Sequence, residues 1–226
     1  MSAAVPISFA TWQGLLNNFA VERAQFGGVE IGILQSLREV PGFLAFAVVF
    51  LLLFVREQKL AYVSLLLLGI GTAVTGFFPT IIGLDITTVV MSLGYHYYET
   101  TAQSLSLQWL DKKDAAHWLG RLIAVGSFAG IIAFALIYVG IDIVGLDFKW
   151  VYFVGGGVTM AIVLVAWTLF PAFPAKVEQN KHLVLRKRYW LYYALVFMSG
   201  ARRQIFVVFA AFMLVERFGF DAGTIA

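Results

Sequence analysis

The amino-acid sequence predicts an all-α, polytopic membrane protein on three observations. Hydrophobic residues make up 61% of the chain and charged residues only 13%, whereas a typical soluble domain is about 25% charged. The mean hydropathy is +0.85, and the apolar residues form continuous runs of about 20 residues, the length of a transmembrane helix. Strands of a membrane barrel alternate polar and apolar residues over about ten positions, so these runs favour helices.

Composition also bears on the class of function. The sequence contains no cysteine, which excludes disulfides, thiolate nucleophiles and cysteine metal sites in these residues. The net charge of +3 lies in connections between apolar runs and forms no basic face, so no nucleic-acid partner is expected. His96 and Glu99 have the spacing of metal ligands, but no second histidine lies within another apolar run. No metal, cofactor or enzymatic activity is therefore predicted.

Seven apolar stretches are predicted to cross the bilayer. The first, 5–21, is polar for its length because it contains Trp12, Gln13, Asn17 and Asn18. These side chains are expected either to line a cavity or to bond neighbouring helices. The remaining stretches are 31–55, 60–78, 86–110, 116–141, 149–170 and 189–215.

The uncharged stretches are expected to lie at the periphery. Stretch 60–78 has no charge and 149–170 has none beyond its first residue, so both are predicted to be lipid-facing or peripheral. Stretch 116–141 carries glycines that predict close approach of a neighbouring helix, namely Gly120, Gly126 and Gly130. Two glycines in 218–226 predict a loop there.

The stretch 31–55 organises the chain because it carries Arg38 and Glu39 inside an apolar run. A charged side chain at the centre of a membrane helix costs about 2.5–3.5 kcal/mol, so neither residue is expected to face lipid. Adjacent helical residues lie about 100° apart, which predicts that the two side chains point in different directions. Arg38 is predicted to make a structural charge pair and Glu39 to take part in proton coupling. Pro41 is expected to bend the helix at this level.

Polar residues also gather in the fourth stretch. Ser92, His96, Glu99 and Gln103 recur at helical offsets, which places them on one stripe that cannot face lipid. Removal from bulk water disfavours the charged forms of His96 and Glu99, so both are predicted to exchange a proton near physiological pH. The alternative is a hydrogen-bonded pair that only joins two helices. Tyr95 lies close to the same stripe.

Arg202 and Arg203 lie in the middle of the seventh stretch. A guanidinium in a cavity suits a carboxylate or phosphate, and three interior arginines against two carboxylates favour an anionic substrate. The alternative is that the two arginines neutralise Glu39 and Glu99 across the cavity. The predicted substrate contacts are Arg202, Arg203, Gln103, Asn17, Asn18, Gln13, Trp12 and Tyr95.

The distribution of lysine and arginine predicts the orientation. These residues concentrate in the second, fourth and sixth connections, whereas the first, third and fifth hold only Arg23 and Lys149. Cytoplasmic connections carry the excess of positive charge, so the amino terminus is predicted to be cytoplasmic. The expected location is the plasma membrane, which in a bacterium is the inner membrane.

A basic connection containing prolines divides the chain. Residues 1–171 are predicted to form a six-span bundle, 172–188 a cytoplasmic linker, and 189–226 the first span of an incomplete second bundle. The second stretch also resembles the fifth, which suggests two three-helix units related as an inverted repeat. The superposed residues are Gly32, Gly42, Ala45 and Phe46 with Gly120, Gly130, Ala133 and Phe134.

This organisation resembles the major facilitator superfamily over essentially the whole chain. Members have twelve spans in two six-helix bundles, a long cytoplasmic loop after the sixth span, and a cavity lined chiefly by spans one, four, seven and ten. Here the basic connection follows the sixth stretch, and polar residues concentrate in the first, fourth and seventh. Leu119, Gly120 and Arg121 resemble the family's usual entry into span five.

The turn between the second and third spans departs from the family pattern. Residues 54–59 keep charges of both signs but have neither the glycines nor the aspartate of the family's charged turn. Arg56 and Glu57 in this turn are predicted to make structural charge pairs.

The resemblance implies a secondary active transporter that moves a small solute by alternating access, as a symporter or antiporter coupled to H⁺ or Na⁺. Seven spans are fewer than twelve, so the chain is expected to be a fragment whose missing carboxy-terminal half is needed for function. A seven-span receptor or sensor without transport activity is the alternative.

Overall fold

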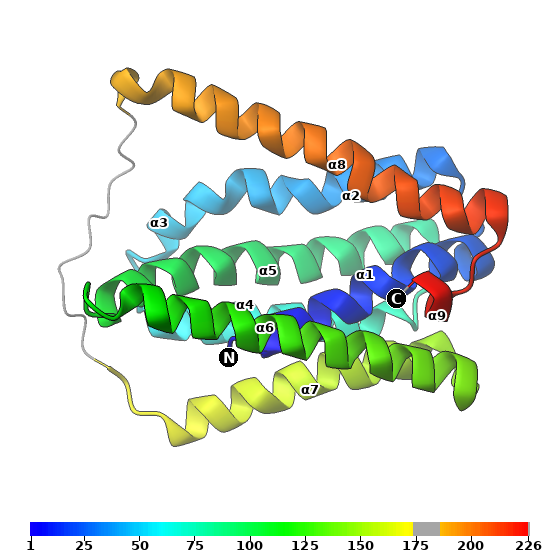
Figure 1. The fold of residues 1–226 in the computed structure, drawn as a ribbon, viewed down its shortest axis with the longest axis horizontal. Coiled ribbons are helices and arrows are strands. Elements are labelled where there is room, and N and C mark those ends of the chain that lie inside the picture. Colours follow the sequence, from blue (N-terminus) through cyan, green and yellow to red (C-terminus); the bar gives the residue numbers. More distant parts are fainter. Residues whose placement is uncertain (174–185, 226) are drawn as a thin grey trace.

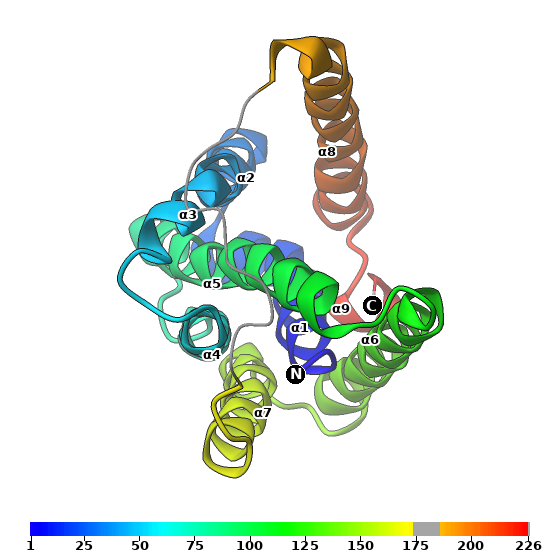
Figure 2. The ribbon, with the colours of Figure 1, turned by 90° about the vertical axis from the view of Figure 1, so that its left-hand side faces the viewer.

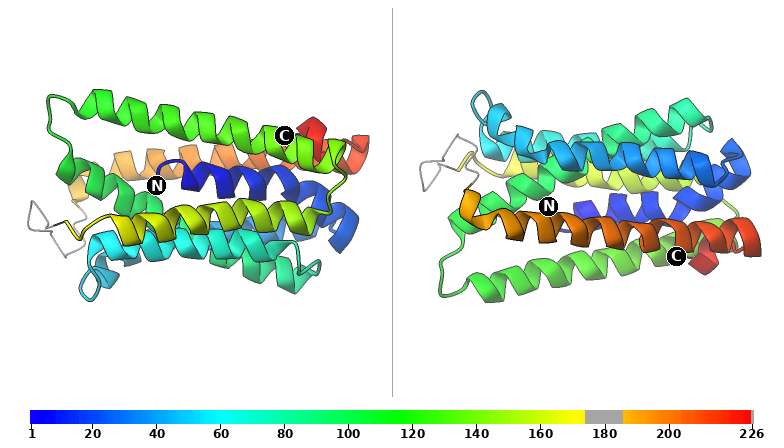
Figure 3. Two further views of the ribbon diagram at one scale, coloured as in Figure 1. Left: turned by 90° about the horizontal axis from the view of Figure 1, so that it is seen from below. Right: turned by 90° about the horizontal axis from the view of Figure 1, so that it is seen from above.

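The computed structural model describes residues 1–173 and 186–225, and leaves out the side chains at 200–207 and 225. Every regular element in these residues is a helix, so the all-α prediction is confirmed. The long helices lie roughly side by side (Figures 1 and 3). They are α1 (Ala4–Ala24), α2 (Gly28–Phe43), α4 (Glu57–Thr75), α5 (Ile81–Trp109), α6 (Ala115–Tyr138), α7 (Phe148–Leu169) and α8 (Trp190–Phe218). The short helices are α3 (Val48–Leu51) and α9 (Ala222–Ile225).

Four helical segments are long and apolar enough to cross a membrane. They are Gly28–Leu51, Glu57–Thr75, Ala115–Ile143 and Phe148–Leu169. The helices α1 and α5 have 21 and 29 residues, which is long enough, but they lie outside this apolar set. Helix α8 has 29 residues and includes the undescribed side chains at 200–207. The described residues are thus compatible with a multi-pass integral membrane protein, and the full set of seven spans stays a prediction.

The second span changes its helix type just after Pro41. Proline has no N–H to donate to the carbonyl of Leu37, and its ring crowds that carbonyl. The α-helix ends at Phe43 and continues as a 3₁₀ segment, Leu44–Ala47, before α3 begins. The disturbance expected at Pro41 therefore takes the form of a tightened turn that begins three residues further on.

The helices alternate in direction, which separates the connections into two sets. The ends of α3, α5 and α7 and the starts of α4, α6 and α8 lie at one end of the bundle (Figure 1). We call this the basic end, because it holds Arg56, Lys59, Lys112, Lys113, Arg186, Lys187 and Arg188. The connections α1–α2, α4–α5, α6–α7 and α8–α9 lie at the opposite end.

The third stretch is more buried than was expected of a lipid-facing helix. More than half of the most apolar part of α4 is buried, and α4 packs against α5, α7 and α1 (Figure 2). An added Cβ at Gly71 would lie 2.5 Å from the amide nitrogen of Met91 on α5, and one at Gly69 would lie 2.9 Å from the carbonyl oxygen of Gly156 on α7. The lack of charge did not mark a peripheral helix here, because small residues let α4 approach two neighbours at once.

The glycines of the fifth stretch do not support the close approach predicted for them. A Cβ at Gly120 would meet nothing within 4 Å, and Cβ atoms at Gly126 and Gly130 would lie 3.4 and 4.0 Å from Pro6 of α1, which is ordinary contact. The close approaches of backbone occur instead on α4, α5 and α7. The prediction is therefore wrong for α6, whose apolar surface is largely exposed.

Contacts between the helices follow a paired pattern. α5 packs against α4 and α2, while α1 packs against α7 and α6, and α4 also contacts α7. The contacts correspond in pairs when α1 is exchanged with α5, α2 with α6 and α4 with α7. The contact of α5 with α4 then corresponds to that of α1 with α7, and the contact of α5 with α2 to that of α1 with α6. The contact of α1 with α4 has no equally extensive counterpart.

Buried hydroxyl groups join α1 to α7. The Ser8 Oγ donates to Thr159 Oγ1 at 2.9 Å, and Thr159 Oγ1 donates to the carbonyl oxygen of Ala4 at 2.8 Å. Replacing Thr159 by valine is expected to lower the free energy of unfolding by about 1 kcal/mol, the usual worth of such bonds between membrane helices. Thermal unfolding in detergent would measure this loss. The control is Thr168→Val on the same helix, where the exposed hydroxyl bonds only to carbonyls of its own helix. Equal losses in the two variants would contradict the assignment.

The chain after α8 is not simply a loop. α8 ends at Phe218 and is capped by Gly219, whose φ of 65° is a left-handed conformation that favours glycine. The carbonyl oxygen of Phe220 then accepts a hydrogen bond from Asn18 Nδ2 at 2.8 Å, and Ala222 is buried against the bundle. The loop predicted for 218–226 is therefore wrong for α9, which docks on α1 and α6. Residue 226, like 174–185 of the predicted linker, lies outside the described residues.

Candidate functional site

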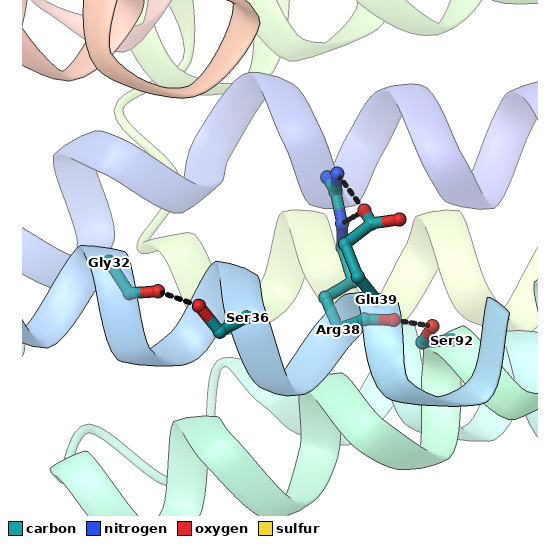
Figure 4. Close-up of polar contacts among 5 residues, drawn as sticks. All are labelled: Gly32, Ser36, Arg38, Glu39 and Ser92. Carbon is teal, nitrogen blue, oxygen red and sulfur yellow. Dashed lines mark hydrogen bonds and ion pairs between the residues drawn. The ribbon is translucent and has the colours of Figure 1, made fainter. Parts of the chain in front are cut away.

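The buried charges of the bundle lie where α2 meets α1 and α5. Arg38 on α2 has a side chain only 8% exposed, whereas that of Glu39 is 42% exposed. The Nε and Nη2 atoms of Arg38 donate to Glu39 Oε1 at 3.0 and 2.6 Å, and both side chains rise from the same side of α2 (Figure 4). A guanidinium that donates two hydrogen bonds to a carboxylate is held in a fixed orientation.

This pair corrects the prediction that the two side chains point in different directions. Their Cβ atoms do leave the helix about 100° apart. Both side chains are long enough to bend toward each other, however, so neighbouring residues can still form the ion pair. The structural charge pair predicted for Arg38 is present, and its partner is the neighbouring residue.

Trp12 of α1 forms the surface beneath Arg38. The Arg38 guanidinium carbon lies 5.8 Å from the centroid of the Trp12 ring, which is a cation–π distance. Trp12 is fully buried, and within the described residues its indole Nε1 has no hydrogen-bond acceptor. Trp12 can therefore hold the Arg38 guanidinium in place. Because Trp12 is fully buried, it could contact a solute only after the helices around it move apart.

α5 closes the other side of the junction. The Ser92 hydroxyl donates to the main-chain carbonyl of Arg38. His96 lies against Gly42, where a Cβ would be only 2.8 Å from the imidazole Cε1. Because Gly42 follows Arg38 and Glu39 within about one helical turn, the imidazole lies near the level of the charge pair, where a change of protonation at one group can act on the others.

The polar stripe of α5 changes in exposure along its length. Ser92 is buried and His96 is half-buried, while Glu99 and Gln103 are exposed. Tyr95 stacks on Phe9 of α1 at 4.6 Å between ring centroids and meets His96 edge-on. The stripe therefore runs from the junction of α1, α2 and α5 out to the surface of the described bundle.

The polar residues predicted on α1 do not share one environment. Gln13 is exposed, whereas Asn17 and Asn18 are buried. Asn18 bonds to Phe220 and so serves the connection after α8, toward the end of the bundle opposite the basic end. Trp12, in contrast, lies against Arg38 of the pair.

Two other groups of predicted residues lie apart from this junction or outside the description. Arg202 and Arg203 belong to α8, but their side chains lie outside the described residues. Arg56 is exposed at the basic end, and Glu57 beside it accepts a hydrogen bond from Gln108 Nε2 at 2.6 Å. Glu57 thus pairs with a neutral amide.

Sequence reasoning missed two residues of the junction. Phe9 carries no polar atom, and nothing in its neighbourhood marks a partner on α5. Gly42 was noted only as part of a repeat, although a glycine one turn after Arg38 is a signal for close approach of another helix.

No metal centre is evident in residues 1–173 and 186–225, where no three His, Cys, Asp or Glu side chains gather as ligands. Comparison of the chain with family models, curated proteins and solved structures finds no match. The assignment of function therefore depends on the arrangement of the residues themselves.

Proposed function

We propose that the protein is a secondary active transporter of the major facilitator type that moves a small anionic solute across the plasma membrane, coupled to H⁺ or another cation. The observation that carries the proposal is the Arg38–Glu39 pair at mid-depth. Within Gly28–Leu51, Arg38 is ten residues from one end and thirteen from the other, or roughly 15 and 20 Å along the helix. Ionisable groups so deep in a membrane protein mark substrate or proton pathways by default.

The paired helix contacts support an inverted repeat of three helices. The exchange that maps the contacts onto themselves replaces α1, α2 and α4 by α5, α6 and α7. Gly42 of α2 lies against His96 of α5, and its counterpart Gly130 of α6 lies against Pro6 of α1. Such units, with a site at their interface near the bilayer midplane, are expected of transporters of this type.

The distribution of polarity supports a cavity between bundles. Two long helices, α1 and α5, lie outside the apolar set, and they correspond to the first and fourth spans. The seventh span, α8, carries Arg202 and Arg203 near its middle. α8 contacts α1 and α2, and a Cβ at Gly32 of α2 would lie 3.8 Å from the ring of Phe209. In the proposed transporter α8 begins a second bundle, and the faces of α1, α2 and α5 toward it line the cavity.

Coupling in this scheme depends on Glu99, His96 and Glu39. A proton bound by a carboxylate or imidazole in the cavity changes the net charge that holds an anion there. Solute and proton binding therefore affect each other, and the two are carried together in a symporter or in opposite directions in an antiporter. Arg202 and Arg203 are proposed to contact the solute. The basic end is proposed to be cytoplasmic, because cytoplasmic connections carry the excess of lysine and arginine.

Glu99→Gln is expected to reduce proton-driven solute flux to the background of empty vesicles, because an amide cannot exchange a proton. The measurement uses the protein expressed from its complete gene, reconstituted in vesicles that contain a pH-sensitive dye and challenged with carboxylate and phosphate solutes. Glu22→Gln, an exposed carboxylate near the end of α1, is the control and should leave the flux unchanged. Wild-type flux in the Glu99 variant would refute the coupling role.

A further inference from the structure

A second feature lies at the basic end, away from the Arg38–Glu39 pair. It is a cavity of about 680 Å³ between residues 52–59, the last turns of α5 and α7, and residues 172–173. Because helices begin and end here, the cavity lies at the level where a bilayer meets water. A cavity of this volume is large enough for a small polar group and part of an apolar chain.

The polar wall of the cavity combines one carboxylate with two cations. Glu57 Oε2 accepts from Gln108, while Glu57 Oε1 is buried and has no hydrogen-bond partner in the described part of the chain. Arg56 and Lys59 flank Glu57, both are exposed, and neither forms an ion pair with another described residue. The wall thus offers a carboxylate oxygen that needs a donor and two cations that suit an anion.

The remaining wall is aromatic and aliphatic. Tyr62 stacks on Trp167 with ring centroids 5.4 Å apart, and Trp109 meets the Phe173 ring edge-on at 5.2 Å. Tryptophan and tyrosine favour the headgroup level of a membrane because their rings are apolar and their N–H and O–H groups are polar. Apolar residues such as Leu105 continue the lining.

We propose that this cavity binds a phospholipid whose headgroup carries a phosphate and a primary ammonium. The phosphate binds Arg56 and Lys59, and the ammonium donates to the unpartnered Oε1 of Glu57. An acyl chain lies along the aromatic and aliphatic wall. A headgroup with a quaternary ammonium has no N–H to donate, and a purely anionic headgroup brings no cation to Glu57. The site requires only that these helix ends lie at a membrane surface, so it is independent of the proposed transport function.

The test compares lipids that differ only in the headgroup. The full chain, purified in detergent, is titrated with phosphatidylethanolamine, phosphatidylcholine and phosphatidylglycerol of the same acyl composition, and bound lipid is counted by native mass spectrometry. Phosphatidylethanolamine is expected to bind about tenfold more tightly than phosphatidylcholine, the value of one hydrogen bond to a charged group. Equal binding of these two lipids, or tighter binding of phosphatidylglycerol, would overturn the proposal without any mutation.

Variants then assign the preference to the carboxylate. Glu57→Gln is expected to make the affinities for phosphatidylethanolamine and phosphatidylcholine equal, whereas Gln108→Ala keeps the carboxylate and should keep the preference. Arg56→Gln is expected to weaken both lipids together, because both carry the phosphate. Asp111→Asn, an exposed carboxylate at the same end, is the matched control and should change nothing. A preference that survives in Glu57→Gln would contradict the proposed contact.

Discussion

Replacing Gly156 by valine is expected to prevent the bundle from folding as described. A Cβ at this position would lie 2.2 Å from the carbonyl oxygen of Gly69 and 2.4 Å from the amide nitrogen of Ala73. Both obstacles are backbone atoms of α4, so no side chain can turn aside, and α4 and α7 must move apart. Overpacking commonly costs 1–3 kcal/mol, and with rigid backbone on the other side we expect a loss of about 3 kcal/mol or more.

The chain offers a close control for this substitution. Gly157 is the next residue of the same helix, and a Cβ there would meet nothing within 4 Å. Gly157→Val should therefore leave the yield of monodisperse protein and its midpoint of thermal unfolding near those of the wild type. If Gly156→Val and Gly157→Val behave alike, the crossing of α4 and α7 is not at Gly156.

Arg38→Gln is expected to give the second largest effect. The change removes two charge-assisted hydrogen bonds to Glu39 and the contact of the guanidinium with Trp12. Together these losses amount to about 3 kcal/mol, because the Arg38 side chain is only 8% exposed and water cannot replace its partners. The measurement is the unfolding free energy in detergent, followed by thermal denaturation or by the loss of helical circular dichroism.

Arg121→Gln tests whether burial is the cause. Arg121 of α6 also lies over a tryptophan, 5.1 Å from the Trp118 ring centroid, but both side chains are exposed. Its loss should change the unfolding free energy by less than about 0.5 kcal/mol. Arg38→Lys keeps the charge without the two-donor geometry, so its stability should fall between those of wild type and Arg38→Gln. A small effect at Arg38, equal to that at Arg121, would mean that the pair does not hold α2 in place.

The sequence was most informative where the helical spacing of polar residues, or a charge within an apolar run, restricts the environment that one side of a helix can have. Continuous apolar runs predicted the helices. The spacing of Ser92, His96, Glu99 and Gln103 predicted a stripe on α5, and the structure packs the Ser92 and His96 part of it against α2. A charge inside an apolar run predicted that Arg38 would be buried and paired. These inferences depend on local spacing and on the cost of charge in an apolar medium, both of which are visible in the residues themselves.

The relation between helices was less predictable. Absence of charge in α4 could not distinguish a lipid-facing helix from a central one, because both environments are apolar. Glycine alone did not distinguish the crossing residue Gly156 from its open neighbour Gly157. The aromatic contact of Phe9 with Tyr95 and the docking of α9 on α1 and α6 join residues far apart in the sequence. Such contacts follow from how the helices assemble, which no single stretch determines.

The proposed solute cavity requires that the polar stripe of α5 face water inside the membrane. Because the chain has no cysteine, Gln103→Cys and Ile123→Cys each introduce a single thiol, at exposed positions of comparable depth on α5 and α6. The measurement is the rate of reaction with a hydrophilic maleimide in lipid vesicles, since only a thiol in water ionises and reacts. Fast labelling at 103 with little at 123 is the predicted result. Little labelling at both positions would place the stripe in lipid or in a dry contact, and would contradict a solute cavity bounded by α1, α2 and α5.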